Sequence, residues 1–109
     1  MEATESTPQW YVLEHTADPA VAGSVFEHPD FPKHVAFLRR LQDEGVLVAA
    51  GPLADTAGDG MTVVRVPDDA AAAEVARAAQ EDDGAVVAGL LSVRVRPWRV
   101  MFGAQSSGS

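Results

Sequence analysis

The stretch FPKHVAFLRRLQDEGVLVAAGPL, residues 31–53, contains a helix and the strand that follows it. At about 100° per residue its large apolar side chains fall on one stripe, as expected for a helix that packs on a sheet. The stripe consists of Phe37, Leu38 and Leu41. Pro32 suits the first turn of a helix and Gly45 its C-terminal cap, so the pattern predicts a helix over residues 31–44. The apolar run 46–50 then predicts a short buried strand.

Four further segments complete the expected fold. QWYVLEH at 9–15 is rich in β-formers and apolar at successive positions, which suits a central strand covered on both faces. The remaining segments are a strand at 61–66, an alanine-rich helix at 67–81 with Asp caps, and an alternating strand at 90–98. The order β-α-β-β-α-β is that of the ferredoxin-like α+β fold, a four-stranded antiparallel sheet with two helices on one face.

The first strand is apolar on both of its faces, and two helices on a single face cannot cover both. Trp10 and Val12 alternate with Tyr11 and Leu13, so each face of the sheet receives large apolar side chains. A large exposed apolar face is unusual for a monomer. We therefore expect a homodimer in which the open faces of two sheets meet and form a shared α/β barrel.

Composition limits the chain to one globular domain and excludes several classes of function. Of the 109 residues 47% are hydrophobic, and we expect a domain at 9–102 between a disordered arm at 1–8 and a flexible tail at 103–109. The net charge of −8 argues against a nucleic-acid surface. The absence of cysteine excludes disulfides, thiolate metal sites and cysteine nucleophiles. No apolar run is long enough to cross a bilayer and the N-terminus is unlike a signal peptide, so we expect a cytoplasmic protein without a membrane partner.

His34 is the misfit of the predicted 31–44 helix, because it lies in the middle of the apolar stripe. A core histidine satisfied by backbone or water is the ordinary explanation. Its place near the helix N-terminus favours another one, since the helix dipole and burial both disfavour the imidazolium. A neutral, partly buried imidazole is a serviceable general base, and His34 is therefore a candidate catalytic residue.

A general base needs a partner that orients it, and the candidates are carboxylates. Asp43 lies about 180° around the helix from His34 and is excluded as a same-face partner, while Glu44 lies too far along the helix. Asp82 and Asp83 follow the second helix, where a short loop could return either acid to the start of the first helix. Aspartate is also common in turns without any chemical role, and that explanation stays open for both.

The other polar and aromatic candidates have competing structural explanations. The three histidines are accompanied by neither cysteine nor an H-x-H or H-x-x-x-H spacing, so we expect no metal site. The loop 51–60 contains glycines but no lysine and does not lead into a helix, so it is not a phosphate loop. Arg94 and Arg96 could bind an anion, although charge that protects an edge strand is the commoner explanation. Candidate substrate-binding residues are His15, Phe37, Gly51, Pro52 and Trp98. The aromatic residues Phe26, Phe37 and Trp98 are candidates for core packing or for lining a pocket, and core packing is favoured.

Two runs of the sequence resemble the YCII-related (YciI-like) family: HPDFPKHVAFLRRLQDEGVLVAAGPL at 28–53 and EDDGAVVAGLLSVRVRPW at 81–98. The matching positions, in order, are His34, Gly45, Gly51, Pro52, Gly60, Asp83, Gly89, Pro97 and Trp98. The resemblance spans residues 10–102. It implies a ferredoxin-like fold, a dimeric α/β barrel, and an active site whose histidine and aspartate are His34 and Asp83 in this chain.

The resemblance leaves the chemistry broad. At least one family member is a cofactor-free dehydrochlorinase that acts on chlorinated aromatic compounds. This chain has Gly84 and Ala85 where the family usually has proline and an aromatic residue, so the resemblance implies a pocket without that aromatic wall and does not carry over a substrate.

Two functions fit these residues. The first is a cofactor-independent enzyme in which His34, oriented by Asp83, moves a proton on a small cyclic or carbonyl-containing molecule in an elimination or isomerisation. The second is a non-catalytic small-molecule binder or accessory dimer that uses the same pocket without turnover. The His and Asp pair favours the enzyme, and the missing pocket aromatic favours the binder.

Overall fold

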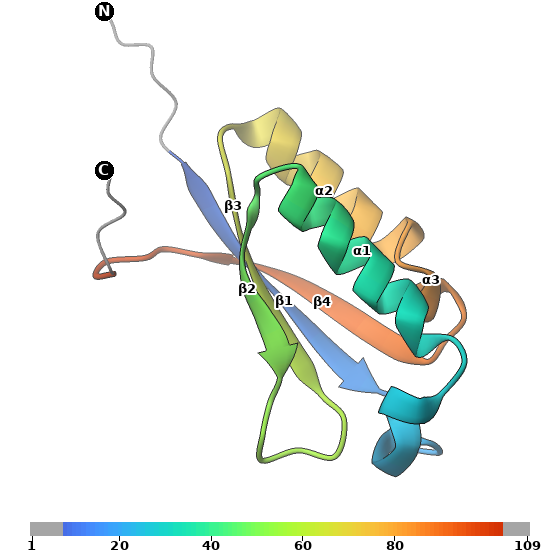
Figure 1. The fold of residues 1–109 in the computed structure, drawn as a ribbon. Coiled ribbons are helices and arrows are strands. Elements are labelled where there is room, and N and C mark those ends of the chain that lie inside the picture. Colours follow the sequence, from blue (N-terminus) through green and yellow to red (C-terminus); the bar gives the residue numbers. More distant parts are fainter. Residues whose placement is uncertain (1–7, 104–109) are drawn as a thin grey trace, which may run out of the picture.

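In a computed structural model, which describes residues 8–103, the chain forms one open sheet with helices against one face (Figure 1). The strands lie in the order β2-β3-β1-β4, and all neighbouring pairs are antiparallel. Their bounds are Gln9–Ala17 for β1, Leu47–Pro52 for β2, Gly60–Val66 for β3 and Leu91–Trp98 for β4. The predicted α+β class and element order are confirmed, and β1 is an interior strand, as its two apolar faces indicated.

The described residues cover the expected domain at 9–102. The expected N-terminal arm and C-terminal tail lie outside them, apart from Pro8 and Gly103. Within 8–103, no helix combines the length and the apolar character needed to cross a bilayer.

Two long helices cover the same face of the sheet and run beside each other in Figure 1. Helix α1 spans Phe31–Asp43 and helix α2 spans Asp69–Glu81, close to the predicted ranges. Gly45 follows the end of α1 with a φ of 78°, a left-handed conformation that glycine adopts without strain. The side chain of Asp68 accepts a hydrogen bond from the amide of Ala71 and caps α2.

Two short helices lie where only loops were expected. The 3-10 helix η1 spans Ala22–Glu27 and the single turn α3 spans Gly84–Val87. Both contribute to a small second core beside the end of β1. Its buried members are Ala17, Val25, Ala85, Leu90 and Leu91. This second core fixes the turn that precedes α3 against the sheet.

The main core lies between the sheet and the two long helices. Its largest members are Leu13, Phe37, Leu41, Val64, Val66 and Val75. Strand β1 continues to Ala17, two residues beyond the prediction, so His15 lies inside the strand and not at its end. Because side chains alternate along a strand, His15 shares the helix-covered face with Leu13, while Val12 lies on the open face.

The strand predicted at 46–50 is present as β2, but the prediction that it is buried is wrong. Strand β2 lies at the edge of the sheet with β3 as its single neighbour, and Val48 is 48% exposed. The register with β3 shifts between Leu47 and Ala49, and Leu47 packs against the main core. An apolar run is compatible with a buried strand, but the position of the strand in the sheet determines whether the strand is buried.

Candidate acid–base site

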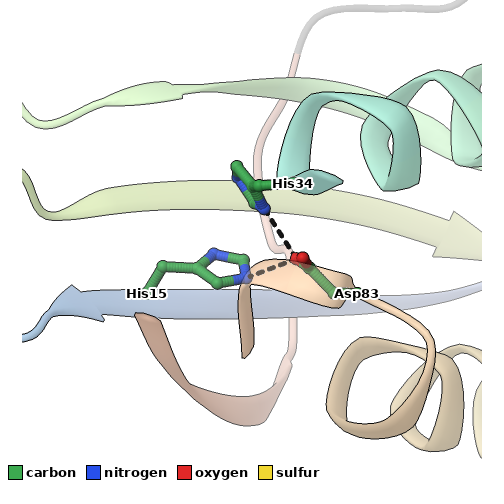
Figure 2. Close-up of side chains that lie close together, drawn as sticks. All are labelled: His15, His34 and Asp83. Carbon is green, nitrogen blue, oxygen red and sulfur yellow. Dashed lines mark hydrogen bonds and ion pairs between the residues drawn. The ribbon is translucent and has the colours of Figure 1, made fainter. Parts of the chain in front are cut away.

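His34 and Asp83 meet at the N-terminal end of α1, where Nδ1 of the ring lies 2.6 Å from the carboxylate oxygen Oδ2 (Figure 2). Both side chains are buried, since His34 is 8% exposed and Asp83 is fully enclosed. The other candidate acid, Asp82, turns the opposite way and accepts hydrogen bonds from Arg40 and Arg77 at the surface. The structure therefore selects Asp83 from the two adjacent acids.

The turn after α2 holds the carboxylate of Asp83 in place. Its oxygen Oδ1 accepts a hydrogen bond of 3.0 Å from the amide of Ala85 and caps α3, which leaves Oδ2 to face His34. The Asp83 amide donates to the carbonyl oxygen of Ala78 at 3.2 Å. A Cβ on Gly84 would lie 2.7 Å from Cδ of Lys33, so the missing side chain lets this turn approach α1 closely.

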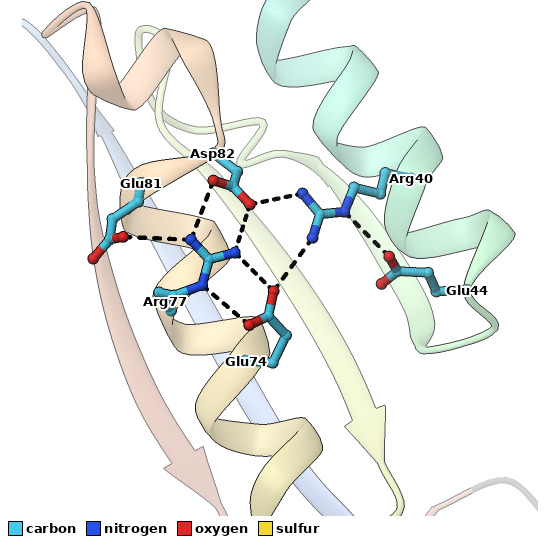
Figure 3. Close-up of polar contacts among 6 residues, drawn as sticks. All are labelled: Arg40, Glu44, Glu74, Arg77, Glu81 and Asp82. Atoms are coloured by element: carbon cyan, nitrogen blue, oxygen red, sulfur yellow. Dashed lines mark hydrogen bonds and ion pairs between the residues drawn. The ribbon is translucent and has the colours of Figure 1, made fainter.

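A cluster of charged side chains joins α1 to the C-terminal end of α2 (Figure 3). Its members are Arg40, Glu44, Glu74, Arg77, Glu81 and Asp82. Hydrogen bonds from Arg77 at 2.7 Å and Arg40 at 2.8 Å lower the pKa of Asp82 to about 2. The pairs are exposed and contribute little stability. They nevertheless tie the residue before Asp83 to the helix that carries His34.

The short contact determines which nitrogen of a neutral His34 carries the proton. A carboxylate has acceptor atoms only, so its hydrogen bond with the ring requires the proton on Nδ1. Nε2 then keeps its lone pair and points away from Asp83. This is the arrangement of a general base that a carboxylate orients.

His15 reaches the same point from β1. Its ring centroid lies 4.6 Å from that of His34, and its Nε2 lies 3.9 Å from Oδ2 of Asp83, too far for a hydrogen bond. His15 is 3% exposed, and among the described residues neither ring nitrogen has a hydrogen-bond partner. Burial, followed by the neighbouring His34, lowers the pKa of His15 to about 4, while Asp83 opposes the shift. His15 is therefore a neutral imidazole at pH 7.

A mostly apolar cavity of about 210 Å³ lies beside the two histidines. Its walls are formed by Phe26, Phe31, Val35, Leu38 and Leu91, and its rim is formed by Gly51, Pro52, Gly58, Asp59, Gly60 and Met61. The rings of Phe26 and Phe31 meet edge to face at 5.2 Å. Neither lysine nor arginine is among the lining residues. The cavity is smaller than the roughly 300–1,000 Å³ of drug-sized ligand sites, so it suits a single small ring.

The loop between β2 and β3 is folded back onto the end of β1 and shapes the cavity rim. Oδ1 of Asp59 accepts a hydrogen bond of 3.0 Å from the amide of Ala17. Gly58 has a φ of 127°, and a Cβ there would lie 2.7 Å from the carbonyl oxygen of Ala22. Glycine is therefore required for the loop to pack on η1.

Three of the five candidate substrate-binding residues line this cavity, and two lie elsewhere. His15, Gly51 and Pro52 are in the lining. Phe37 is 3% exposed within the main core. Trp98 packs edge to face on the ring of Trp10, with centroids 6.1 Å apart. It lines a wider surface depression of about 500 Å³ whose lining residues include no histidine or carboxylate, so that depression offers no comparable acid–base pair.

The sequence indicated only part of the aromatic wall of the cavity: Phe26 was a pocket-lining candidate for which core packing was favoured, and Phe31 was missed. The side chain of Ala85, where the family usually has an aromatic residue, is fully buried in the second core. The cavity nevertheless has an aromatic wall, because Phe26 and Phe31 provide it. Helical spacing could have identified Phe31 and Leu38, since they lie three residues before and four residues after His34 on the same stripe.

Comparison with known proteins points to one family. The family model of the YCII-related domain matches residues 10–99. A search of the curated proteins gave no match. Among solved structures, a hydantoinase/carbamoylase family amidase from Burkholderia ambifaria is similar, with 18% sequence identity and a TM-score of 0.52. The match covers 88% of this chain and 29% of the amidase chain, so it supports the fold alone.

Proposed function

The chain belongs to the YCII-related domain family, and we propose that it is a small cytoplasmic enzyme in which His34 and Asp83 transfer a proton on a small, uncharged, cyclic or carbonyl-containing molecule. The observation that carries this proposal is the buried contact of 2.6 Å between the two side chains, placed beside an apolar cavity. A structural histidine would be satisfied by any acceptor. Asp83 is a carboxylate that is fully enclosed and fixed by the Ala85 amide, and burying a charged group costs more free energy than burying a neutral acceptor. Such a partner suits a ring that becomes charged during a reaction.

In the proposed reaction Nε2 of His34 removes a proton from the substrate. The charge that forms on the ring is stabilised by Asp83, whose Oδ2 accepts the hydrogen bond from Nδ1. Return of the proton to another carbon gives an isomerisation, and return to a departing group gives an elimination. General acid–base catalysis of this kind contributes about 10²–10⁴-fold to a rate.

The cavity lining supports an uncharged substrate. Its walls are aromatic and aliphatic, and it contains the carboxylate of Asp59 but no lysine or arginine. A carboxylate or phosphate group on the substrate would find no cation there and would be repelled by Asp59 and Asp83. A ketone, an enone or a phenol with one small ring meets the size and the polarity of the site.

The open face of the sheet is the proposed interface of a homodimer. Val12 and Trp10 point away from the helices, and on the neighbouring strands Met61 and Trp98 are 39% and 45% exposed. An ion pair of 3.3 Å between Arg96 and Glu14 lies on the same face, so the surface is mixed and not uniformly apolar. Two such faces packed together would form the barrel that the family resemblance implies.

Hydrogen–deuterium exchange at the α-carbon of cyclohexanone, followed by proton NMR in D₂O, tests the proposed function without knowledge of the natural substrate. The EDTA-treated protein should accelerate exchange, and His34→Gln and Asp83→Asn should each lower the catalysed rate by about 100-fold or more. His28→Gln is the matched control, because His28 is outside the cavity lining. The charged analogue 4-oxocyclohexanecarboxylate should exchange more slowly than cyclohexanone. Equal exchange by wild type and His34→Gln would overturn the proposal, and saturable binding without exchange would support the non-catalytic binder.

A further inference from the structure

The buried ring of His15 has polar atoms that the fold leaves without partners. It is 3% exposed, and neither Nδ1 nor Nε2 forms a hydrogen bond with any described residue. A buried polar side chain without partners costs free energy, and in native proteins it usually marks a bound water or ion. The proposed proton transfer does not use this ring, so its burial beside His34 needs another explanation.

His15, His34 and Asp83 present one ligand atom each within 4.8 Å of one another. Two imidazole nitrogens and one carboxylate oxygen are a donor set of catalytic zinc sites and of other divalent transition metals. Metal–ligand bonds of about 2.0–2.2 Å place neighbouring ligand atoms about 3–3.5 Å apart. The separation of 2.6 Å between His34 and Asp83 would widen and that of 3.9 Å between His15 and Asp83 would close, each by less than about 1 Å.

The three ligands are held by separate, well-fixed elements (Figure 2). His15 lies on the interior strand β1, His34 in the first turns of α1, and Asp83 in the capped turn before α3. The hydrogen bond from the Ala85 amide to Oδ1 of Asp83 orients the carboxylate, as outer hydrogen bonds do for metal ligands in general. The adjoining cavity of about 210 Å³ leaves room for a further ligand on the open side.

We infer that His15, His34 and Asp83 form a binding site for one divalent transition-metal ion, with Zn²⁺ as the best match to the donor set. The site shares two residues with the proposed acid–base pair, so the ion and the catalytic proton compete for it. A metal on Nδ1 of His34 forces the remaining ring proton onto Nε2, which then has no lone pair for a substrate proton. The binding itself does not depend on the proposed function, and only this inhibition rests on it.

Titration of the EDTA-dialysed full chain with Co²⁺, followed by its visible absorption, tests the site directly. Wild-type protein should bind one ion per chain, and His15→Gln and Asp83→Asn should each weaken binding by about 100-fold. His28→Gln is the matched control: His28 and Asp30 are also 3.9 Å apart, but both are partly exposed and have no third ligand nearby among the described residues. This control should bind as wild type does.

Three results would overturn the inference: no saturable binding by wild type, undiminished binding by a folded His15→Gln variant, or loss of binding in His28→Gln. If circular dichroism shows that His15→Gln does not fold, two other measurements test the inference. Asp83→Asn should bind Co²⁺ more weakly, and Zn²⁺ should shift the NMR signals of the His15 ring in wild-type protein. The metal titration involves no substrate, so an absence of metal binding would not change the result expected from the hydrogen–deuterium exchange test of the metal-free protein. Failure of the exchange test likewise leaves metal binding unaffected.

Discussion

Nδ1 of His34 lies 2.6 Å from Oδ2 of Asp83, although 49 positions separate the two residues in the chain. The contact forms because α1 and the turn after α2 approach each other at the same end of the sheet. Asp83 carries out two tasks there, since one carboxylate oxygen caps α3 through the Ala85 amide and the other faces the ring. A structural role and the proposed chemical role are therefore joined in one side chain, and substitutions can separate them.

Asp83→Ala should lower the free energy of unfolding by about 3 kcal/mol, because it removes both a charged hydrogen bond and a helix cap. Asp83→Asn keeps an oxygen for the Ala85 amide and should cost only about 1–2 kcal/mol. Urea denaturation at pH 7 measures both values, and Leu41→Ala, in the main core, gives a reference loss of about 2–5 kcal/mol. If both Asp83 variants stay within 0.5 kcal/mol of wild type, about the ordinary range for surface substitutions, the described contacts are not formed in solution.

The metal-free protein should lose stability in mild acid because of His15. Its pKa is lowered to about 4 in the folded chain, against about 6.5 in an unfolded one. Between these values the unfolded chain binds a proton that the folded chain does not, so stability falls as the pH is lowered from 6.5 to 4. The loss amounts to roughly 2–3 kcal/mol at pH 4.5.

Urea denaturation of wild type and His15→Gln at pH 7.5 and pH 4.5 isolates this contribution, because the other titrating groups are common to both proteins. The variant should lose less stability between the two pH values than wild type does. His28→Gln should behave as wild type. An equal loss in wild type and His15→Gln would show that His15 is not buried as described.

Gly58→Ala should destabilise the cavity rim. The glycine has a φ of 127°, and a Cβ would approach the Ala22 carbonyl oxygen to 2.7 Å and Val25 Cγ1 to 2.8 Å. We expect a loss of about 1–3 kcal/mol in the free energy of unfolding. Gly23→Ala is the control, because a Cβ there meets nothing within 4 Å. Similar stability for the two variants would mean that the loop does not pack on η1.

Val12→Lys should convert the proposed dimer to a monomer, since it places a charge in the middle of the open sheet face. Ala73→Lys, on the exposed side of α2, adds the same charge away from that face and should leave the dimer unchanged. Sedimentation at micromolar concentration distinguishes the two masses. A wild-type protein that sediments as a monomer would show that the proposed dimer does not form.

Much of the fold could be predicted because it depends on local periodicity. The apolar stripe of Phe37 and Leu41 and the cap at Gly45 located α1, and the alternation from Leu91 to Val95 located β4. Strand β2 was predicted, but its exposed position at the edge was missed, because burial depends on the order of the strands and not on the residues of one strand. The single turn α3 was missed because it is too short to show a helical period.

Only part of the candidate site could be predicted from the sequence. His34 is out of place on its own stripe, so local pattern was enough to identify it. The choice between Asp82 and Asp83 depends on how the chain leaves α2, which sends one acid to Arg77 and the next inward. His15 was placed at the end of a strand, whereas it continues the inward-facing series of Tyr11 and Leu13. The spacing argument against a metal site considered ligands within one segment, whereas the site that we infer draws its ligands from three.

The most direct test of the central claim is the protonation state of the His34 ring nitrogens in the metal-free protein. At pH 9, well above the usual range of imidazole ionisation, ¹⁵N NMR should show the proton on Nδ1 and a bare lone pair on Nε2, as the hydrogen bond to Asp83 requires. A ring that carries its proton on Nε2 would have no lone pair to offer a substrate on that side. That result would contradict the account of His34 as a base oriented by Asp83.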